Sequence, residues 1–339
     1  MRKVGLLCVA IVTISCTPLP PVPFLEDADL APPVVLEVGL PDPGRLRIVL
    51  DEPVELVTGP IPSHGLSLEG SELEGDSLVV RFVEPPSPET EHHVEAQVRD
   101  LSGNHLRFVV RFYGLNPNLP SMLINEFTTQ GSGNHPDLVE IVSLTAGNIA
   151  GACVFEGTPE NWEQRFVLPS VNVSAGDYIV VHFKPEGIPE EVDETRSRSA
   201  SGGRDASPTA WDFWVPEGSG LSGNNGVVSL CRNALGGYVD AVLYSNRTSD
   251  SDEHYRGFGS RDVVERADAL AAAGAWVSRA GQRCVLAPED AIDPEPSTAT
   301  RSMSRDSDST DSNTANDWHI TPTLGLSPGE PNTDEIYEP

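Results

Sequence analysis

The pattern that most constrains this chain is a repeated alternation of apolar and polar residues between positions 33 and 113. A period of two places successive side chains on opposite faces of a β-strand. The alternation occurs in four runs, which contain Leu46, Ile48 and Leu50; Leu78, Val80 and Phe82; Val94, Ala96 and Val98; and Leu106, Phe108, Val110 and Phe112. Short runs of this kind, separated by Pro and Gly, predict an antiparallel Ig-like β-sandwich over residues 33–115.

Two turn segments accompany these runs. The sequence DLSGN at 100–104 lies between the last two runs, and its Ser, Gly and Asn favour a tight hairpin. Together with LDEPV at 50–54, it resembles the bacterial Ig-like (SbsA-type) modules of surface proteins. The resemblance covers about residues 32–113 and implies a structural module.

An ordered set of motifs follows the Pro-containing linker at 113–121. MLINEF at 122–127 and DLVEI at 137–141 resemble the opening of the lamin-tail domain. Further pieces come in family order, namely residues 176–181, 225–230 and 237–244, Arg301 with Asp317 and Trp318, and residues 322–332. The resemblance implies a second Ig-like sandwich over 121–332.

Two segments interrupt this second pattern. Residues 184–225 predict a long loop, and residues 261–283 predict an inserted amphipathic helix. The fold class expected is therefore all-β, with two tandem antiparallel sandwiches and a helical insertion in the second.

The first 32 residues predict export and anchoring. Arg2 and Lys3 precede an apolar run that is too short to cross a bilayer, which is the layout of a secretory signal peptide over 1–15. TISC at 13–16 resembles a lipobox, which implies lipidation of Cys16; the alternative is ordinary cleavage without a lipid. Residues 16–32 are rich in Pro and predict a semi-rigid tether. The expected location is the periplasm or the outer surface, with the membrane contacted through the lipid.

The charge of the chain disfavours nucleic acid as a partner. The formal net charge is −29, and removal of Arg2 and Lys3 changes it to −31 and leaves Lys184 as the sole lysine. Nucleic-acid affinity depends on Lys and Arg that neutralise phosphates. A protein or glycan partner remains compatible with this surface.

Three cysteines remain in the body of the chain, Cys153, Cys231 and Cys284. In an oxidising compartment they permit one disulfide and one free thiol. Cys153 and Cys231 lie in strand-like runs and are the first candidate pair; three buried thiols are the alternative.

Four acidic residues recur in the lamin-tail pattern, Glu126, Asp137, Glu140 and Asp240. One hypothesis is an oxygen-ligand site for Ca²⁺. The favoured interpretation is that they cap loops and pair with backbone N–H groups or Arg.

The Ser- and Asp-rich segment 306–313 contains Asp306, Asp308 and Asp311 at spacings reminiscent of calcium loops. It lacks the Gly and the distal Glu of an EF-hand. We therefore expect a solvated loop and no metal or other cofactor, with Ca²⁺ as the weaker hypothesis.

Trp211, Phe213 and Trp214 lie in the predicted 184–225 loop, where core packing does not require aromatic residues. Exposed aromatics on a loop are typical anchors for a partner. The alternative is a satellite cluster that covers the edge of the sandwich.

The sequence contains no H-E-x-x-H, no paired C-x-x-C and no P-loop, so an enzyme is not expected. We predict a cell-envelope lipoprotein that acts as a non-catalytic binding or scaffolding module. The alternatives are a metal-dependent secreted hydrolase, or an accessory subunit of one, and a passive structural envelope protein.

Overall fold

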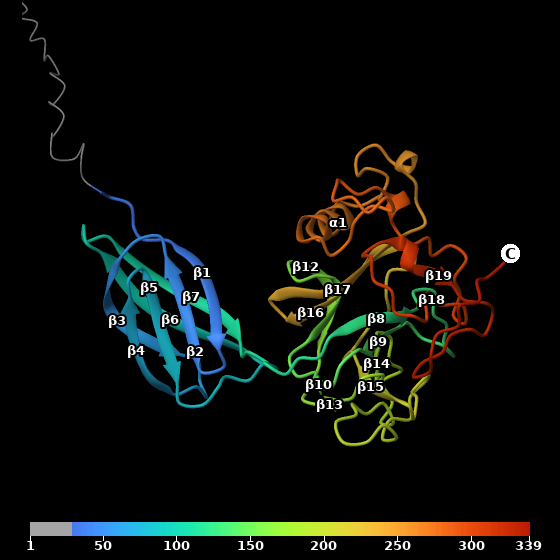
Figure 1. Ribbon diagram of the computed structural model, residues 1–339, viewed down its shortest axis with the longest axis horizontal. Helices are drawn as coiled ribbons and strands as arrows, with labels where there is room; N and C mark the ends of the chain where they lie inside the picture. The colour runs from blue at the N-terminus through green and yellow to red at the C-terminus, as the bar shows by residue number, and fades with distance from the viewer. Residues whose placement is uncertain (1–28) are drawn as a thin grey trace, which may run out of the picture.

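The structure is a computed structural model that describes residues 29–339. The predicted signal peptide, Cys16 and tether residues 16–28 lie outside the described residues. Figure 1 shows two β-rich parts connected by the segment between β7 and β8. These two parts correspond to the two runs of motifs in the sequence.

The first part contains two antiparallel sheets. The strands are β1 (Val35–Asp42), β2 (Arg45–Leu50), β3 (Val54–Pro62), β4 (Leu68–Glu74), β5 (Ser77–Phe82), β6 (Glu91–Asp100) and β7 (His105–Tyr113). One sheet has the order β1-β2-β5-β4, and the other has the order β3-β6-β7. The alternating residues predicted to face inward form the core between them, with Leu46, Ile48 and Val80 from one sheet and Val94 and Phe112 from the other.

The second part is built on a six-stranded sheet with the order β15-β14-β9-β8-β18-β19. These strands are β8 (Met122–Phe127), β9 (Leu138–Ser143), β14 (Tyr178–His182), β15 (Ala210–Trp214), β18 (Met303–Arg305) and β19 (Trp318–Ile320). Strand β15 comes from the segment predicted as a loop at 184–225, and it pairs in parallel with β14. The inserted segment therefore returns to the sheet and extends its edge.

A four-stranded antiparallel sheet packs against the six-stranded one, with the order β12-β11-β16-β17. Its strands are β11 (Cys153–Thr158), β12 (Asn161–Val167), β16 (Asn225–Asn233) and β17 (Gly236–Ser245), and a small sheet pairs β10 (Gly147–Asn148) with β13 (Asn172–Val173). Buried residues of both larger sheets share one core, including Ile124 and Ile141 from the first and Val154, Leu230 and Val242 from the second.

The inserted helix α1 spans Arg261–Ala273. Ser260 caps its start by accepting the Val263 N–H, and Gly274 ends it in the left-handed region at φ 70°. The predicted insertion extended to residue 283, but Gly274 ends the helix earlier. Val263, Ala267 and Leu270 are buried and join the core of the second part.

Strands make up 39% and helices 7% of the residues that the structure describes, so the predicted all-β class is confirmed. Among the described residues, no helix is long and apolar enough to cross a membrane.

Candidate functional site

Two motif carboxylates lie side by side on the outer face of the six-stranded sheet. Glu126 on β8 and Glu140 on β9 are direct cross-strand partners. The neighbours Val139 and Ile141 point into the core, so Glu140 points the opposite way. Both carboxylates are nevertheless fully buried. The C-terminal strap, which we define as residues 322–332, contacts both carboxylates.

Hydroxyl, amide and backbone N–H groups satisfy these two carboxylates. Glu126 accepts from the Ser304 hydroxyl at 3.0 Å and from the Ser327 backbone N–H at 3.0 Å. Glu140 accepts from the Gly329 backbone N–H at 2.5 Å and from the Asn125 side-chain amide at 2.7 Å. Ser327 and Gly329 belong to the strap, so the carboxylates fix it to the sheet.

Asparagines hold the end of the strap. The Asn332 amide donates to the backbone carbonyls of Asn125 at 2.9 Å and Arg305 at 2.8 Å. The Asn125 amide donates in return to Asn332 Oδ1 at 3.0 Å. The first and last motifs of the lamin-tail resemblance thus contact each other directly.

The pKa values of the two glutamates reflect their surroundings. Burial raises the pKa of Glu126, and the donated hydrogen bond from Ser302 partly opposes this. Burial and the nearby Glu126 charge raise the pKa of Glu140 well above its usual value. Two adjacent carboxylates in a low-dielectric site favour a shared proton over two full charges.

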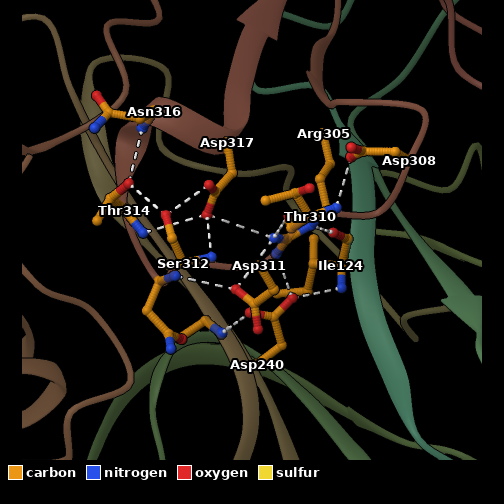
Figure 2. A network of polar contacts seen from close by, with 12 residues as sticks. Ile124, Asp240, Arg305, Asp308, Thr310, Asp311, Ser312, Thr314, Asn316 and Asp317 are labelled. Carbon is orange, nitrogen blue, oxygen red and sulfur yellow. Dashed lines mark hydrogen bonds and ion pairs between the residues drawn. The ribbon is translucent and has the colours of Figure 1, made fainter. Parts of the chain in front are cut away.

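A second buried network surrounds Arg305 on β18, as Figure 2 shows. Its guanidinium donates to Asp240 Oδ2 at 2.7 Å and to the Ile124 carbonyl at 2.9 Å. A further bond reaches the Thr310 carbonyl at 3.0 Å, and Asp311 Oδ1 lies at 3.2 Å. Arg305 therefore links β8 and β17 to the 306–313 loop.

Asp240 is held from several sides. It also accepts the backbone N–H groups of Ile124 and Ala241, each at 2.7 Å. Burial raises its pKa to about 6 although the Arg305 charge acts in the opposite direction. The resemblance singled out Arg301, but the arginine that pairs with Asp240 is Arg305. The Arg301 guanidinium lies 4.1 Å from the centre of the Tyr337 ring.

Asp137, the remaining motif carboxylate, joins two loops. It accepts the Gly131 N–H at 2.6 Å and the Leu221 N–H at 2.9 Å. Burial raises its pKa despite these bonds. All four motif carboxylates make the backbone or arginine contacts of the favoured sequence interpretation.

The three aspartates of the 306–313 loop have separate contacts. Asp306 lies 3.1 Å from the His319 ring, Asp308 accepts the Thr310 N–H at 2.9 Å, and Asp311 accepts from Arg305 and from the Asn313 N–H at 3.1 Å. The loop uses these carboxylates to fix its own turns and to meet Arg305. Within residues 29–339 they do not form a group with the ligand-atom spacing of a metal site.

A different acidic group was missed at the sequence level. Carboxylate oxygens of Asp29, Glu52 and Asp100 lie within 4.8 Å of one another in the first part of the chain. Asp100 already accepts the Asn104 backbone N–H at 2.8 Å and the Asn104 amide at 2.7 Å. The sequence offered a way to find this group, because Glu52 and Asp100 belong to the two Ig-like turn motifs.

The structure buries two of the three aromatic residues of the insertion, which favours the packed alternative over exposed partner anchors. Phe213 is buried in the core, and Trp214 is 5% exposed and stacks on His182 at 3.8 Å. Trp211 is partly buried and packs against the same core. The physical reason is strand β15, whose alternation directs Phe213 inward and places Trp214 under the 184–209 segment.

Cys153 and Cys231 are both buried, and Cys284 is exposed. All three are thiols in the structure. Cys153 and Cys231 are nevertheless direct partners on neighbouring strands β11 and β16.

Comparison with known proteins identifies a family that matches the second part of the chain. The family model TP_1001_2nd, described as "protein second domain", matches residues 120–320, which is more than half of the chain. The chain belongs to this family. Both carboxylates of the glutamate pair and the Arg305–Asp240 pair lie inside the matched region of this second-domain family. The strap residues Ser327, Gly329 and Asn332 lie beyond it.

A relative in Treponema pallidum (strain Nichols) is named "Uncharacterized protein" and is 24% identical over 202 residues. The match covers 59% of this chain and 51% of the relative, so the chain spans about half the length of that protein. A solved S-layer protein, rSbsC(31-844), matches 64% of this chain and 41% of its own at 11% identity, with a TM-score of 0.24.

Proposed function

We propose that this chain is a cell-envelope lipoprotein that acts as a non-catalytic scaffolding module. In this proposal Cys16 carries the lipid, the Pro-rich segment 16–32 is the tether, and two β-sandwiches are displayed in the periplasm or on the outer surface. The lamin-tail resemblance of residues 121–332 supports the same class of role, because it implies a structural adapter fold. Fold alone does not specify a ligand.

The observation that carries the proposal is the use of the motif carboxylates. Glu126, Glu140, Asp137 and Asp240 are at most 4% exposed, and each receives hydrogen bonds from loop or strap groups. A hydrolase with a catalytic metal requires carboxylates that converge on an open site with a coordination position for water. The contacts of these four residues instead hold distant segments of the chain together.

The burial of Phe213 and Trp214 favours the passive structural alternative over partner capture by this strand. A scaffold that binds its partner elsewhere on its acidic surface remains our proposal. Immobilised chain should then retain a partner from envelope extract, and the capture should persist in a Trp211→Ala variant. Capture of no partner by the intact chain would leave the passive structural role.

Metal titration separates the scaffold from the hydrolase alternative. We expect the melting temperature of the second part to show no saturable rise with millimolar Ca²⁺, Mn²⁺ or Zn²⁺, because its motif carboxylates are already hydrogen-bonded. A saturable rise that disappears in Asp311→Asn but persists in the control Asp250→Asn would contradict the proposal. Asp250 is an exposed aspartate outside the 306–313 loop.

A further inference from the structure

Two cysteines that are distant in sequence meet in the centre of the four-stranded sheet. Cys153 on β11 and Cys231 on β16 lie 78 positions apart and are direct cross-strand partners. Directly opposed residues in an antiparallel pair have Cα atoms about 4.5 to 5.5 Å apart. This spacing falls in the Cα range of about 4.4 to 6.8 Å that a disulfide requires.

The two side chains also share a face. Both belong to one buried cluster with Phe155, Ala234 and Tyr113. Their strand neighbours Val154 and Leu230 belong instead to the main core, on the opposite face of the sheet. The register therefore places the two thiol groups together, and the exposed Cys284 lies outside this cluster.

We propose that Cys153 and Cys231 form a cross-strand disulfide in the exported protein. The inference rests on the export that is part of the proposed function, because disulfides persist in oxidising compartments. The two thiols lose two protons and two electrons as the S–S bond forms. A disulfide-carrying oxidant, such as a thiol oxidoreductase or oxidised glutathione, takes up the electrons and is released as two thiols.

The burial of the pair determines when the bond forms. Both side chains are fully buried, and burial raises the pKa of Cys231 to about 12 and raises that of Cys153 further. The reactive species is the thiolate, which is scarce under these conditions. Oxidation therefore occurs before β11 and β16 close into the folded sheet, and the finished bond is then protected from reductants.

The bond would connect the two central strands of the sheet beneath the end of the first part. Tyr113, the last residue of β7, packs in the same cluster. A crosslink between positions this far apart strongly reduces the conformational entropy of the unfolded chain. We expect reduction to lower the melting temperature of the second part by about 5 to 10 °C.

The test is peptide mapping of the full chain purified from its own membranes. Free thiols are blocked with iodoacetamide under denaturing conditions, and digests are compared with and without reduction. We expect a linked peptide pair that contains Cys153 and Cys231, and an alkylated Cys284. In Cys284→Ser the same linked pair persists, and in Cys231→Ser Cys153 becomes alkylated. Alkylation of both Cys153 and Cys231 in the wild type, or linkage of either to Cys284, overturns the proposal.

A second arm separates failure of the pairing from failure of export. The full chain is unfolded and refolded with oxidised glutathione, and then mapped in the same way. If the pair is reduced in cells but links on refolding, the geometry is correct and the proposed export is wrong. If the pair stays reduced in both arms, the pairing itself is wrong, whatever the location of the protein.

Discussion

Arg305 shows how one residue holds together segments that are far apart in the sequence. Its side chain is 1% exposed and contacts β8, β17 and the 306–313 loop. Burial of a charge is tolerated when the charge is paired and hydrogen-bonded. The network is therefore a structural junction of the second part.

Replacement of Arg305 by Met leaves Asp240 buried without its cation. We expect a loss of about 3 to 5 kcal/mol in the free energy of unfolding, measured by urea denaturation of the second part at pH 7. Arg261→Met is the matched control, because the Arg261–Glu265 pair on α1 is exposed and should contribute no measurable stability. Equal stabilities of the Arg305 and Arg261 variants would contradict this role.

Glu140 should make stability depend on pH in a defined direction. Its folded pKa is raised by burial and by Glu126, so the folded state holds its proton more tightly than the unfolded state does. Glu140 therefore contributes to the free energy of unfolding. This contribution is fully present below the ordinary glutamate pKa of about 4.3 and is lost as the pH rises through the raised pKa of the folded state. In Glu140→Gln the decline of stability above that pH should be shallower than in the wild type.

Glu289 provides a control of opposite sign. The Ser249 backbone N–H lowers its pKa, so its contribution is present above about pH 4.3 and is lost as the pH falls through the lowered value. Glu289→Gln should leave the decline at higher pH unchanged. Thermal melts of the three proteins between pH 4 and 9 make the comparison, and identical slopes for all three would refute the assignment to Glu140.

The sequence identified these carboxylates but not their partners. Glu126 and Glu140 were recognised from motifs, and their cross-strand position follows from neighbouring strands. Ser327 and Gly329 lie 201 and 189 positions away from them, respectively. Such contacts depend on the tertiary path of the chain, which local patterns do not encode.

At the scale of elements, the alternating pattern predicted β2, β5, β6 and β7 of the first part but not β1, β3 and β4. Strand β15 was missed because it is short and was assigned to a loop, although Trp211 and Phe213 alternate with Asp212 and Trp214. Its pairing with β14 is parallel, which requires the long returning segment between them. Helix α1 was predicted correctly from its apolar spacing, but its end is set by Gly274.

The C-terminal strap should be an integral part of the second sandwich. Deletion of residues 322–339 removes the Ser327 and Gly329 donors from two buried carboxyl groups. A hydrogen bond contributes about 0.5 to 1.5 kcal/mol, or about 1.5 to 3 kcal/mol where the acceptor is charged. We expect faster cleavage by a protease under native conditions and a lower melting temperature. Deletion of residues 335–339 alone should have a smaller effect, because Tyr337 contributes one backbone bond to Ile320 and a ring contact with Arg301 but no bond to the buried carboxyl groups. Equal protease resistance of the two truncated chains would contradict this view of the strap.

At the scale of the whole molecule, the dominant property is an excess of negative charge, with a formal net charge of −29. Like-charge repulsion destabilises the compact state, and salt screens it over a Debye length of about 3 Å at 1 M. We expect the melting temperature at pH 7 to rise between 0.05 and 1 M NaCl. A fall would indicate that the surface ion pairs outweigh the net repulsion.

The tandem all-β organisation was predictable because two sets of motifs follow one another along the chain. The order of strands within each sheet was not, because β18 and β19 join β8 from a distant part of the sequence. Lipidation and location are predicted from residues that lie outside the described part of the chain. These two properties and the partner stay proposals.

The most direct test of the central claim is the intact mass of the protein purified from its own membranes, compared with a Cys16→Ser variant. We expect a mature chain that begins at Cys16 and carries a diacylglyceryl group. The variant should lose both the added mass and the membrane association. A mature wild-type chain without lipid would contradict the anchored scaffold.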